Sequence, residues 1–123
     1  MRVVSHNPQA YAEKAPDLTI IDVEIPTPKP HEVLIKVDVA GVNRPDLLQR
    51  KGSYPPPADA SPYMGLEVSG TITAIGNAVS GFKVGDQVCA LTPGGGYAEY
   101  ATAHAGHCFP VPAGLSMLMA AAA

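Results

Sequence analysis

Polar side chains gather within residues 41–67, where an alternating strand gives way to a proline-rich connection. Asn43 and Asp46 bring an amide and a carboxylate, and Tyr54 brings a flat ring and a hydroxyl just ahead of three prolines. Such groups can hydrogen-bond to a small ligand and stack on it, and connections held by a rigid scaffold often carry binding and catalysis. A structural alternative stays open, with Asn43 as a helix N-cap, Asp46 on the positive helix end and Tyr54 anchoring the proline loop.

Two other groups of residues invite a chemical interpretation that their context does not support. The glycines at 94–96 lack a helix-opening Gly-x-Gly-x-x-Gly pattern and a following Lys-Ser/Thr, so they predict a tight turn between strands. His104, His107 and Cys108 have a spacing that matches no closed four-ligand metal site. We interpret them as a solvated turn with a buried Cys108, and we expect Cys89 in the core.

Composition places the chain among ordinary globular domains and argues against several partners. Its 123 residues fit one domain, and 46% hydrophobic residues suffice for a core. A net charge of −3 without a lysine or arginine cluster argues against nucleic acid. No apolar run approaches the roughly 20 residues of a membrane span, and the N-terminus lacks the apolar core of a signal peptide. The 2 cysteines suit a reducing compartment, so we expect a cytoplasmic domain with no membrane partner.

Short apolar runs separated by turn residues predict the elements that hold the polar stretch. The run at residues 32–42 alternates with period two, which places Val33 and Ile35 on one face and Leu34 on the other. Short strands at this spacing favour a mostly β fold, as a small antiparallel barrel or sandwich. The expected strands are residues 2–5, 18–25, 32–42, 67–75, 87–91, 97–102 and 108–111.

Glycines and caps mark the remaining features of the predicted fold. Gly70 interrupts a strand and indicates a bulge or a close approach of another backbone. A short helix is expected over residues 43–52, and a second helix begins near Leu115.

Several motifs occur in an order and at intervals that resemble one known family. They are Gly41-Val42-Asn43-x-x-Asp46, Gly65-Leu66-Glu67-x-x-Gly70, Val84-Gly85-Asp86-x-Val88 and Gly95-Gly96-Tyr97-Ala98-Glu99-Tyr100. Together they look like the N-terminal, GroES-like domain of the medium-chain dehydrogenase/reductase superfamily, and the similarity covers nearly the whole chain. The run Gln-Arg-Lys-Gly-Ser-Tyr-Pro-Pro-Pro at 49–57 is closest to its zinc-free quinone oxidoreductase branch, the zeta-crystallin-like enzymes. The resemblance implies a GroES-like, partly open β-barrel with short helices.

Two positions depart from the zinc-dependent members of this superfamily. Zinc alcohol dehydrogenases place a Cys where this chain has Asn43 and a His where it has Leu66. Neither Asn nor Leu supplies the thiolate or imidazole that a catalytic Zn²⁺ needs, and the four closely spaced cysteines of the structural zinc lobe are missing too. The resemblance therefore implies the quinone reductase branch, with no zinc and no other metal.

The same resemblance suggests a role for each residue of the polar stretch. Asn43 and Asp46 would be cofactor-binding residues near the nicotinamide end of NADPH. Tyr54 would be the catalytic contact, lining the cleft in which a quinone ring stacks and offering its ring or its hydroxyl. Glu67 matches a family position below the active site and is expected to be structural. The implied reaction is hydride transfer from NADPH to a quinone or an enone-like acceptor.

The family also implies a second domain. Its helix near Leu115 leads into a Rossmann domain that carries the cofactor fingerprint, so we expect the domain at 1–123 to be truncated before it and inactive alone. The full-length protein is expected to be a homo-oligomer. Two alternatives stay open: a non-catalytic GroES-like binding or assembly module, and a zinc-type alcohol dehydrogenase domain, which Asn43 and Leu66 disfavour. The sequence does not choose between NADPH and NADH, or name the acceptor.

Overall fold

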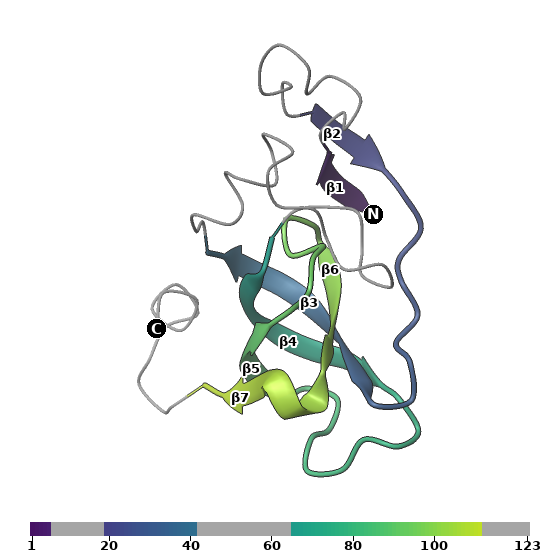
Figure 1. The fold of residues 1–123 in the computed structure, drawn as a ribbon, viewed down its shortest axis with the longest axis vertical. Coiled ribbons are helices and arrows are strands. Elements are labelled where there is room, and N and C mark those ends of the chain that lie inside the picture. The colour runs from purple at the N-terminus through teal and green to yellow at the C-terminus, as the bar shows by residue number, and fades with distance from the viewer. Residues whose placement is uncertain (6–18, 42–64, 112–123) are drawn as a thin grey trace.

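The computed structural model describes residues 1–5, 19–41 and 65–111, which form two antiparallel sheets (Figure 1). β1 (Arg2–Ser5) and β2 (Thr19–Asp22) pair as a separate ribbon. The other sheet has five strands in the order β6-β3-β4-β5-β7. Its elements are β3 (Glu32–Ala40), β4 (Glu67–Ile75), β5 (Gln87–Leu91), β6 (Tyr100–His104), the 3-10 turn η2 (Ala105–His107) and β7 (Cys108–Pro110).

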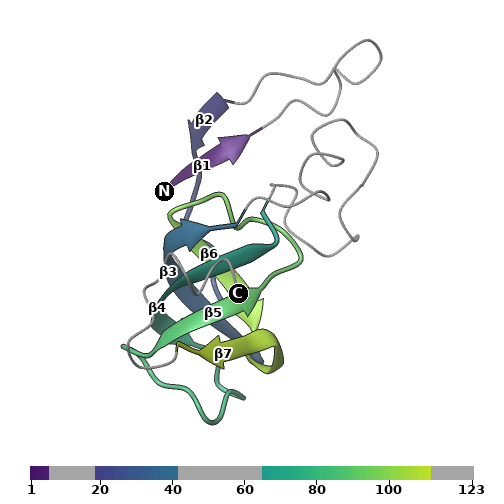
Figure 2. The same ribbon diagram turned by 90° about the vertical axis from the view of Figure 1, so that its left-hand side faces the viewer.

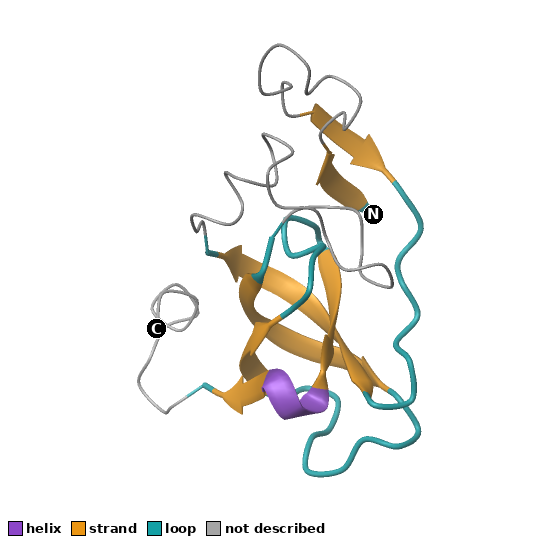
Figure 3. Ribbon diagram, viewed as in Figure 1, coloured by secondary structure: helices purple, strands orange, loops and turns teal. Residues whose placement is uncertain are grey.

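The five-stranded sheet curls around one apolar core and forms the predicted partly open barrel (Figure 3). Val33 and Ile35 of β3 are fully buried, as are Val68 and Ile72 of β4 and Val88 of β5. Side chains two residues apart in a strand point to the same face, so the period-two pattern delivers these residues to the concave side. Burying each such side chain stabilises the fold by about 1.5–3 kcal/mol.

Two side chains differ from their predicted burial. Leu34 lies on the opposite side of β3 from its neighbours, yet it is only 8% exposed. The β3–β4 ladder shifts register between Leu34 and Ile35, so the strict alternation of faces is interrupted at this residue. Cys89, expected in the core, is half-buried instead, because Val88 and Ala90 on either side of it occupy the inward positions of β5.

Gly70 is the predicted point of close backbone approach between β3 and β4. A Cβ on this residue would lie 2.1 Å from the Lys36 carbonyl oxygen and 2.8 Å from Cγ2 of Ile35. The ladder between the two strands also shifts register between Val37 and Val39. Only a residue without a side chain fits here, which explains the glycine within an otherwise apolar strand.

The ribbon of β1 and β2 lies beyond one end of the barrel and is tied to the chain just before β6 (Figure 2). Val3 forms an isolated bridge with Ala98, and the Val4 N–H donates to the Tyr97 carbonyl at 2.8 Å. These bonds explain why β6 begins at Tyr100, whereas the sequence predicted a start at residue 97. The backbone of residues 97–99 instead joins the ribbon to the barrel.

Other element boundaries also differ from the prediction. β2 covers Thr19–Asp22 instead of 18–25, because its partner β1 offers only four residues to pair with. β3 ends at Ala40, and β6 continues to His104. The helix expected over 43–52 and the one near Leu115 lie outside the described residues. Within the described ranges, no helix is long and apolar enough to span a membrane.

Candidate functional site

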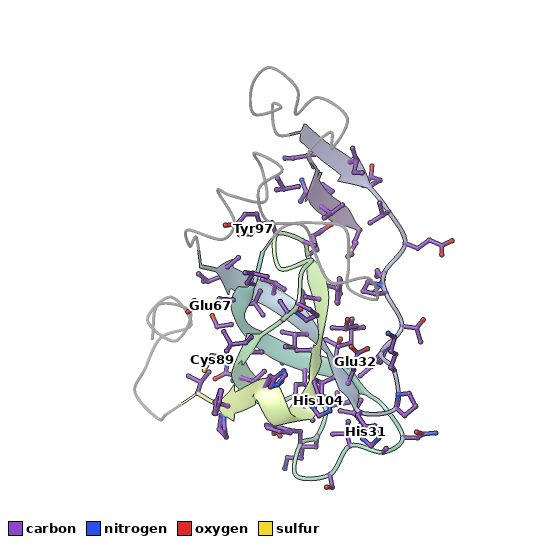
Figure 4. The ribbon with its side chains drawn as sticks, in the orientation of Figure 1. His31, Glu32, Glu67, Cys89, Tyr97 and His104 are labelled. Atoms are coloured by element: carbon purple, nitrogen blue, oxygen red, sulfur yellow. The ribbon has the colours of Figure 1, made fainter. Side chains whose placement is uncertain are left out.

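Residues from three of the sequence motifs meet at the end of β3. We call Gly41, residues 65–67, Gly96 and Tyr97 the glycine corner; Glu67 and Tyr97 are labelled in Figure 4. The Gly41 N–H donates to the Glu67 carbonyl at 2.8 Å, and the Gly96 N–H donates to the Gly65 carbonyl at 3.0 Å. The Tyr97 hydroxyl lies 3.4 Å from the Gly41 carbonyl oxygen. The glycine corner therefore fixes the two points between which residues 42–64 run.

Some of the residues predicted for the site are described in the structure, and others are not. Asn43, Asp46 and Tyr54 all lie within 42–64, outside the described residues, so their roles stay predictions. Leu66 is described: it is half-buried, and its carbonyl accepts from the Thr92 N–H at 2.9 Å. Glu67 begins β4, directly across from Leu91 of β5, and its carbonyl is one of the three carbonyl acceptors in the glycine corner.

A cavity of about 330 Å³ opens beside the glycine corner, between the β1–β2 ribbon and the end of β3. Its volume is at the lower end of the range for small-molecule sites. The walls are mostly apolar, and the charged groups on them are Asp38, Arg2 and Glu99. Its apolar and corner residues include Val3, Ile20, Val37, Ala40, Gly96 and Tyr97.

Glu99 is a structural residue that sequence reasoning quoted within a motif but gave no role. Its carboxylate Oε1 accepts from the Arg2 backbone N–H, and the Arg2 guanidinium lies 3.7 Å away on an exposed surface. The backbone hydrogen bond, followed by the charge of Arg2, lowers the pKa of Glu99 below its ordinary value. The partner lies 97 residues away along the chain, so no local pattern could have indicated this contact.

The burial of His104, His107 and Cys108 matches the predicted solvated turn with a buried cysteine. Cys108 is 6% exposed and belongs to the core, whereas both histidines are exposed. Burial, followed by the charge of Cys89, raises the pKa of the Cys108 thiol to about 11, so this sulfur is held as a neutral thiol. In the described part of the chain, no three His, Cys, Asp or Glu residues are arranged to hold a metal ion.

Comparison with known proteins places these features in a family. The alcohol dehydrogenase GroES-like domain matches residues 29–113. A quinone oxidoreductase of Mus musculus is 44% identical over 103 residues, which cover 82% of this chain and 31% of that protein. A trans-enoyl reductase of Gibberella fujikuroi is 37% identical over 106 residues, or 81% of this chain and 30% of that protein.

A solved structure supports the same assignment of the fold. The crystal structure of Escherichia coli quinone oxidoreductase complexed with NADPH matches with a TM-score of 0.82 and 26% identity, over 99% of this chain and 36% of that one. This chain therefore spans about a third of the length of the relatives it matches.

Proposed function

The chain belongs to the alcohol dehydrogenase GroES-like domain family of the medium-chain dehydrogenase/reductases, and from this premise we propose that it is the substrate-side domain of an NADPH-dependent quinone oxidoreductase. The glycine corner is the observation that carries the proposal, because it brings together Gly41 and Gly65, the described residues on either side of 42–64, beside a cavity of about 330 Å³. Asn43 follows Gly41 by two residues, so the covalent chain keeps their Cα atoms within about 8 Å of each other.

We propose that this chain contacts one end of the cofactor. The glycines at 94–96 turn back on Gly65 and do not open a helix, so they offer no seat for a pyrophosphate. We propose that Asn43 and Asp46 bind the nicotinamide end, and that the rest of NADPH is held by a second domain. NADPH, when bound, supplies the hydride.

Tyr54 is the proposed contact to the acceptor. Its ring offers a flat surface on which a quinone can stack, and its hydroxyl can donate to the quinone oxygen that gains negative charge during reduction. The reaction consumes NADPH, a proton and a quinone and gives NADP⁺ and a hydroquinone. An α,β-unsaturated carbonyl compound is a second candidate acceptor, supported by the likeness to a trans-enoyl reductase.

We propose that the site works without zinc, because Asn43 and Leu66 carry neither a thiolate nor an imidazole. Elemental analysis of the purified protein tests this, and stoichiometric zinc would contradict it. We also propose a cytoplasmic location, which is supported by two free cysteines, Cys89 and Cys108, in the described structure. That the complete protein is a homo-oligomer is a proposal that rests on the family resemblance alone. Size-exclusion chromatography with light scattering of the complete protein measures the oligomeric state.

The function is tested by assaying NADPH oxidation with a benzoquinone and, in parallel, with an α,β-unsaturated ketone. The assay uses the complete protein that carries this chain, with the 123-residue chain alone as a control. We expect turnover by the complete protein and none by the chain alone, because the chain has no dinucleotide fingerprint of its own. Activity of the isolated chain would overturn the proposal that it needs a second domain. Failure of the complete protein with both acceptors would overturn the proposed reaction.

A further inference from the structure

The cavity beside the glycine corner has walls from two separate parts of the chain. Val4 and Ile20 pair directly across the β1–β2 ladder and form one wall, and Val37 and Ala40 near the end of β3 form another. Ile20 is 70% exposed, although its side chain is large and apolar. A protein cavity of about 150 Å³ holds benzene, so the volume of about 330 Å³ here admits a small ring compound.

Backbone hydrogen bonds hold these walls in place. The Val4 N–H donates to the Tyr97 carbonyl at 2.8 Å. The Glu99 N–H donates to the Arg2 carbonyl at 3.1 Å, and the Val37 N–H donates to the Glu99 carbonyl at 2.9 Å. The chain just before β6 therefore joins the ribbon to the end of β3, so the backbone forms the cavity before any ligand binds.

The charged side chains on the described walls leave a net negative charge. Arg2 and Glu99 offset each other, since the guanidinium Nε lies 3.7 Å from the carboxylate Oε1. Asp38 of β3 is the remaining charged residue among the described ones that line the cavity, and it is exposed. An anion in the cavity is therefore repelled, whereas an uncharged molecule is not.

The combination of apolar walls and one excess carboxylate indicates which ligands the cavity favours. Ring carbons are stabilised when they leave water and contact Val4, Ile20 and Val37. A sulfonate or carboxylate on the same ring would bring a second negative charge close to Asp38. The guanidinium on the described walls already faces Glu99, so it compensates the new charge poorly.

We propose that this cavity is a subsite for the ring of an uncharged acceptor, and that Asp38 makes the site discriminate against anionic acceptors. This inference rests on the proposed function, because it specifies which quinones or α,β-unsaturated carbonyl compounds the same site takes. At a separation of about 6 Å, one carboxylate disfavours an anion roughly three- to tenfold, depending on the local dielectric constant. Salt screens exposed charges, so the discrimination weakens as the ionic strength rises.

The test uses the complete protein that carries this chain and two matched acceptors. One is a dimethylnaphthoquinone, whose quinone ring is blocked against thiols, and the other is the same compound with a sulfonate on its second ring. The measured quantity is the anion ratio, which is kcat/KM for the sulfonate divided by kcat/KM for the uncharged compound. We expect Asp38→Asn to raise the anion ratio roughly three- to tenfold at low salt, mainly through the KM of the sulfonate, and high salt to remove most of this gain.

Asp86→Asn is the matched control, because it removes the same charge at a residue that does not line the cavity. Its amide oxygen can still accept from the Lys83 N–H, which the Asp86 carboxylate accepts at 3.0 Å. We expect the anion ratio to stay unchanged in this variant. Ile20→Lys places a cation on the cavity wall at an exposed position, so it should raise the anion ratio as Asp38→Asn does.

Binding without NADPH separates this inference from the proposed function. Equilibrium dialysis gives the Kd of both naphthoquinones whether or not the protein reduces them. We expect the Kd of the sulfonate, relative to that of the uncharged compound, to fall roughly three- to tenfold in Asp38→Asn. If this relative Kd falls but no turnover occurs, the proposed reaction is wrong and the subsite is supported.

Two results overturn the subsite. One is a folded Asp38→Asn variant in which both the anion ratio and the relative Kd are unchanged, while the unaltered protein reduces quinones. If Asp38→Asn does not fold, unchanged values in Ile20→Lys have the same meaning. The other result is an equal rise of the anion ratio in Asp86→Asn, which would assign the effect to the net charge of the protein and not to the cavity.

Discussion

The hydroxyl of Thr92 lies 2.9 Å from the carbonyl oxygen of Thr102. Thr92 directly follows β5 and Thr102 lies in β6, and these two strands are not neighbours in the sheet. The same hydroxyl lies 2.9 Å from the Gly94 carbonyl oxygen, and Thr92 is 5% exposed. One buried side chain thus connects the open edge of the barrel and the glycine turn.

Replacing Thr92 by valine keeps the volume and removes this connection. The Thr102 and Gly94 carbonyl oxygens then lose the single hydroxyl proton that they share near the core, so we expect the free energy of unfolding to fall by about 1–3 kcal/mol. Thr73→Val is the control, because Thr73 is exposed and its hydroxyl lies 3.5 Å from the Leu34 carbonyl, at the limit of a hydrogen bond. Urea unfolding of both variants measures the difference, and equal losses would contradict the role given to Thr92.

A second prediction concerns the glycine corner. A Cβ on Gly65 would lie 2.5 Å from the Tyr97 nitrogen and 2.7 Å from the Gly96 Cα, at a backbone φ of +105°. Gly65→Ala therefore meets both strain and a backbone clash, and we expect it to reduce stability by about 2–4 kcal/mol.

Gly85→Ala separates the two causes. Gly85 has a similar φ of +98°, but a Cβ there would meet nothing within 4 Å. We expect this control to lose only the strain, about 1–2 kcal/mol. If thermal or urea unfolding gives the same loss for both variants, the contact between Gly65 and the backbone of residues 96–97 does not constrain the corner.

The pH dependence of stability should reveal the bond between Arg2 and Glu99. The pKa of Glu99 is lowered from 4.5 in the folded chain, so the unfolded chain binds its proton first as the pH falls. The contribution of the carboxylate is complete above pH 4.5 and is lost as the pH falls through the lower folded pKa. We therefore expect the stability difference between the unaltered chain and Glu99→Gln to shrink below pH 4.5.

Arg2→Gln is the control for this effect. It removes the guanidinium but keeps the backbone N–H, which is the larger cause of the lowered pKa. We expect Glu99 in this variant to titrate still below its ordinary value, as carboxyl ¹³C shifts would measure. A return of the Glu99 pKa to 4.5 in Arg2→Gln would assign the effect to the side chain instead.

The elements that the sequence predicted best are those fixed by local pattern. The bounds of β4 and β5 match the predicted ranges, because alternating apolar residues lie between clear turn signals. The close backbone approach at Gly70 was also predictable, because a glycine inside a strand often marks a bulge or such a contact. The start of β6 was placed three residues early, because residues 97–99 bond to the distant β1.

Contacts between distant residues decided what the sequence could not predict about the site. The Arg2–Glu99 bond and the Thr92–Thr102 contact join segments whose neighbourhood depends on how the sheet curls. The position of His104 opposite Glu32 depends on the β3–β6 register, which no motif specifies. The roles of Asn43, Asp46 and Tyr54 came from family resemblance, and they lie outside the described residues.

The last prediction tests the proposed role of Tyr54 in the complete protein. If its hydroxyl donates to the quinone oxygen that gains charge, Tyr54→Phe should lower kcat/KM for quinone about tenfold, the equivalent of one hydrogen bond of about 1.4 kcal/mol to a charged group. Tyr54→Ala should lower it further, because the stacking surface is lost too. Unchanged unfolding midpoints in both variants would confirm that the fold is intact.

Comparing the two variants separates the ring from the hydroxyl. A role in stacking alone leaves Tyr54→Phe at full activity and impairs only Tyr54→Ala, mainly through KM. A role in transition-state stabilisation lowers kcat in Tyr54→Phe with little change in KM. Full activity of both variants would remove Tyr54 from the acceptor site and favour the alternative in which it anchors the proline-rich connection.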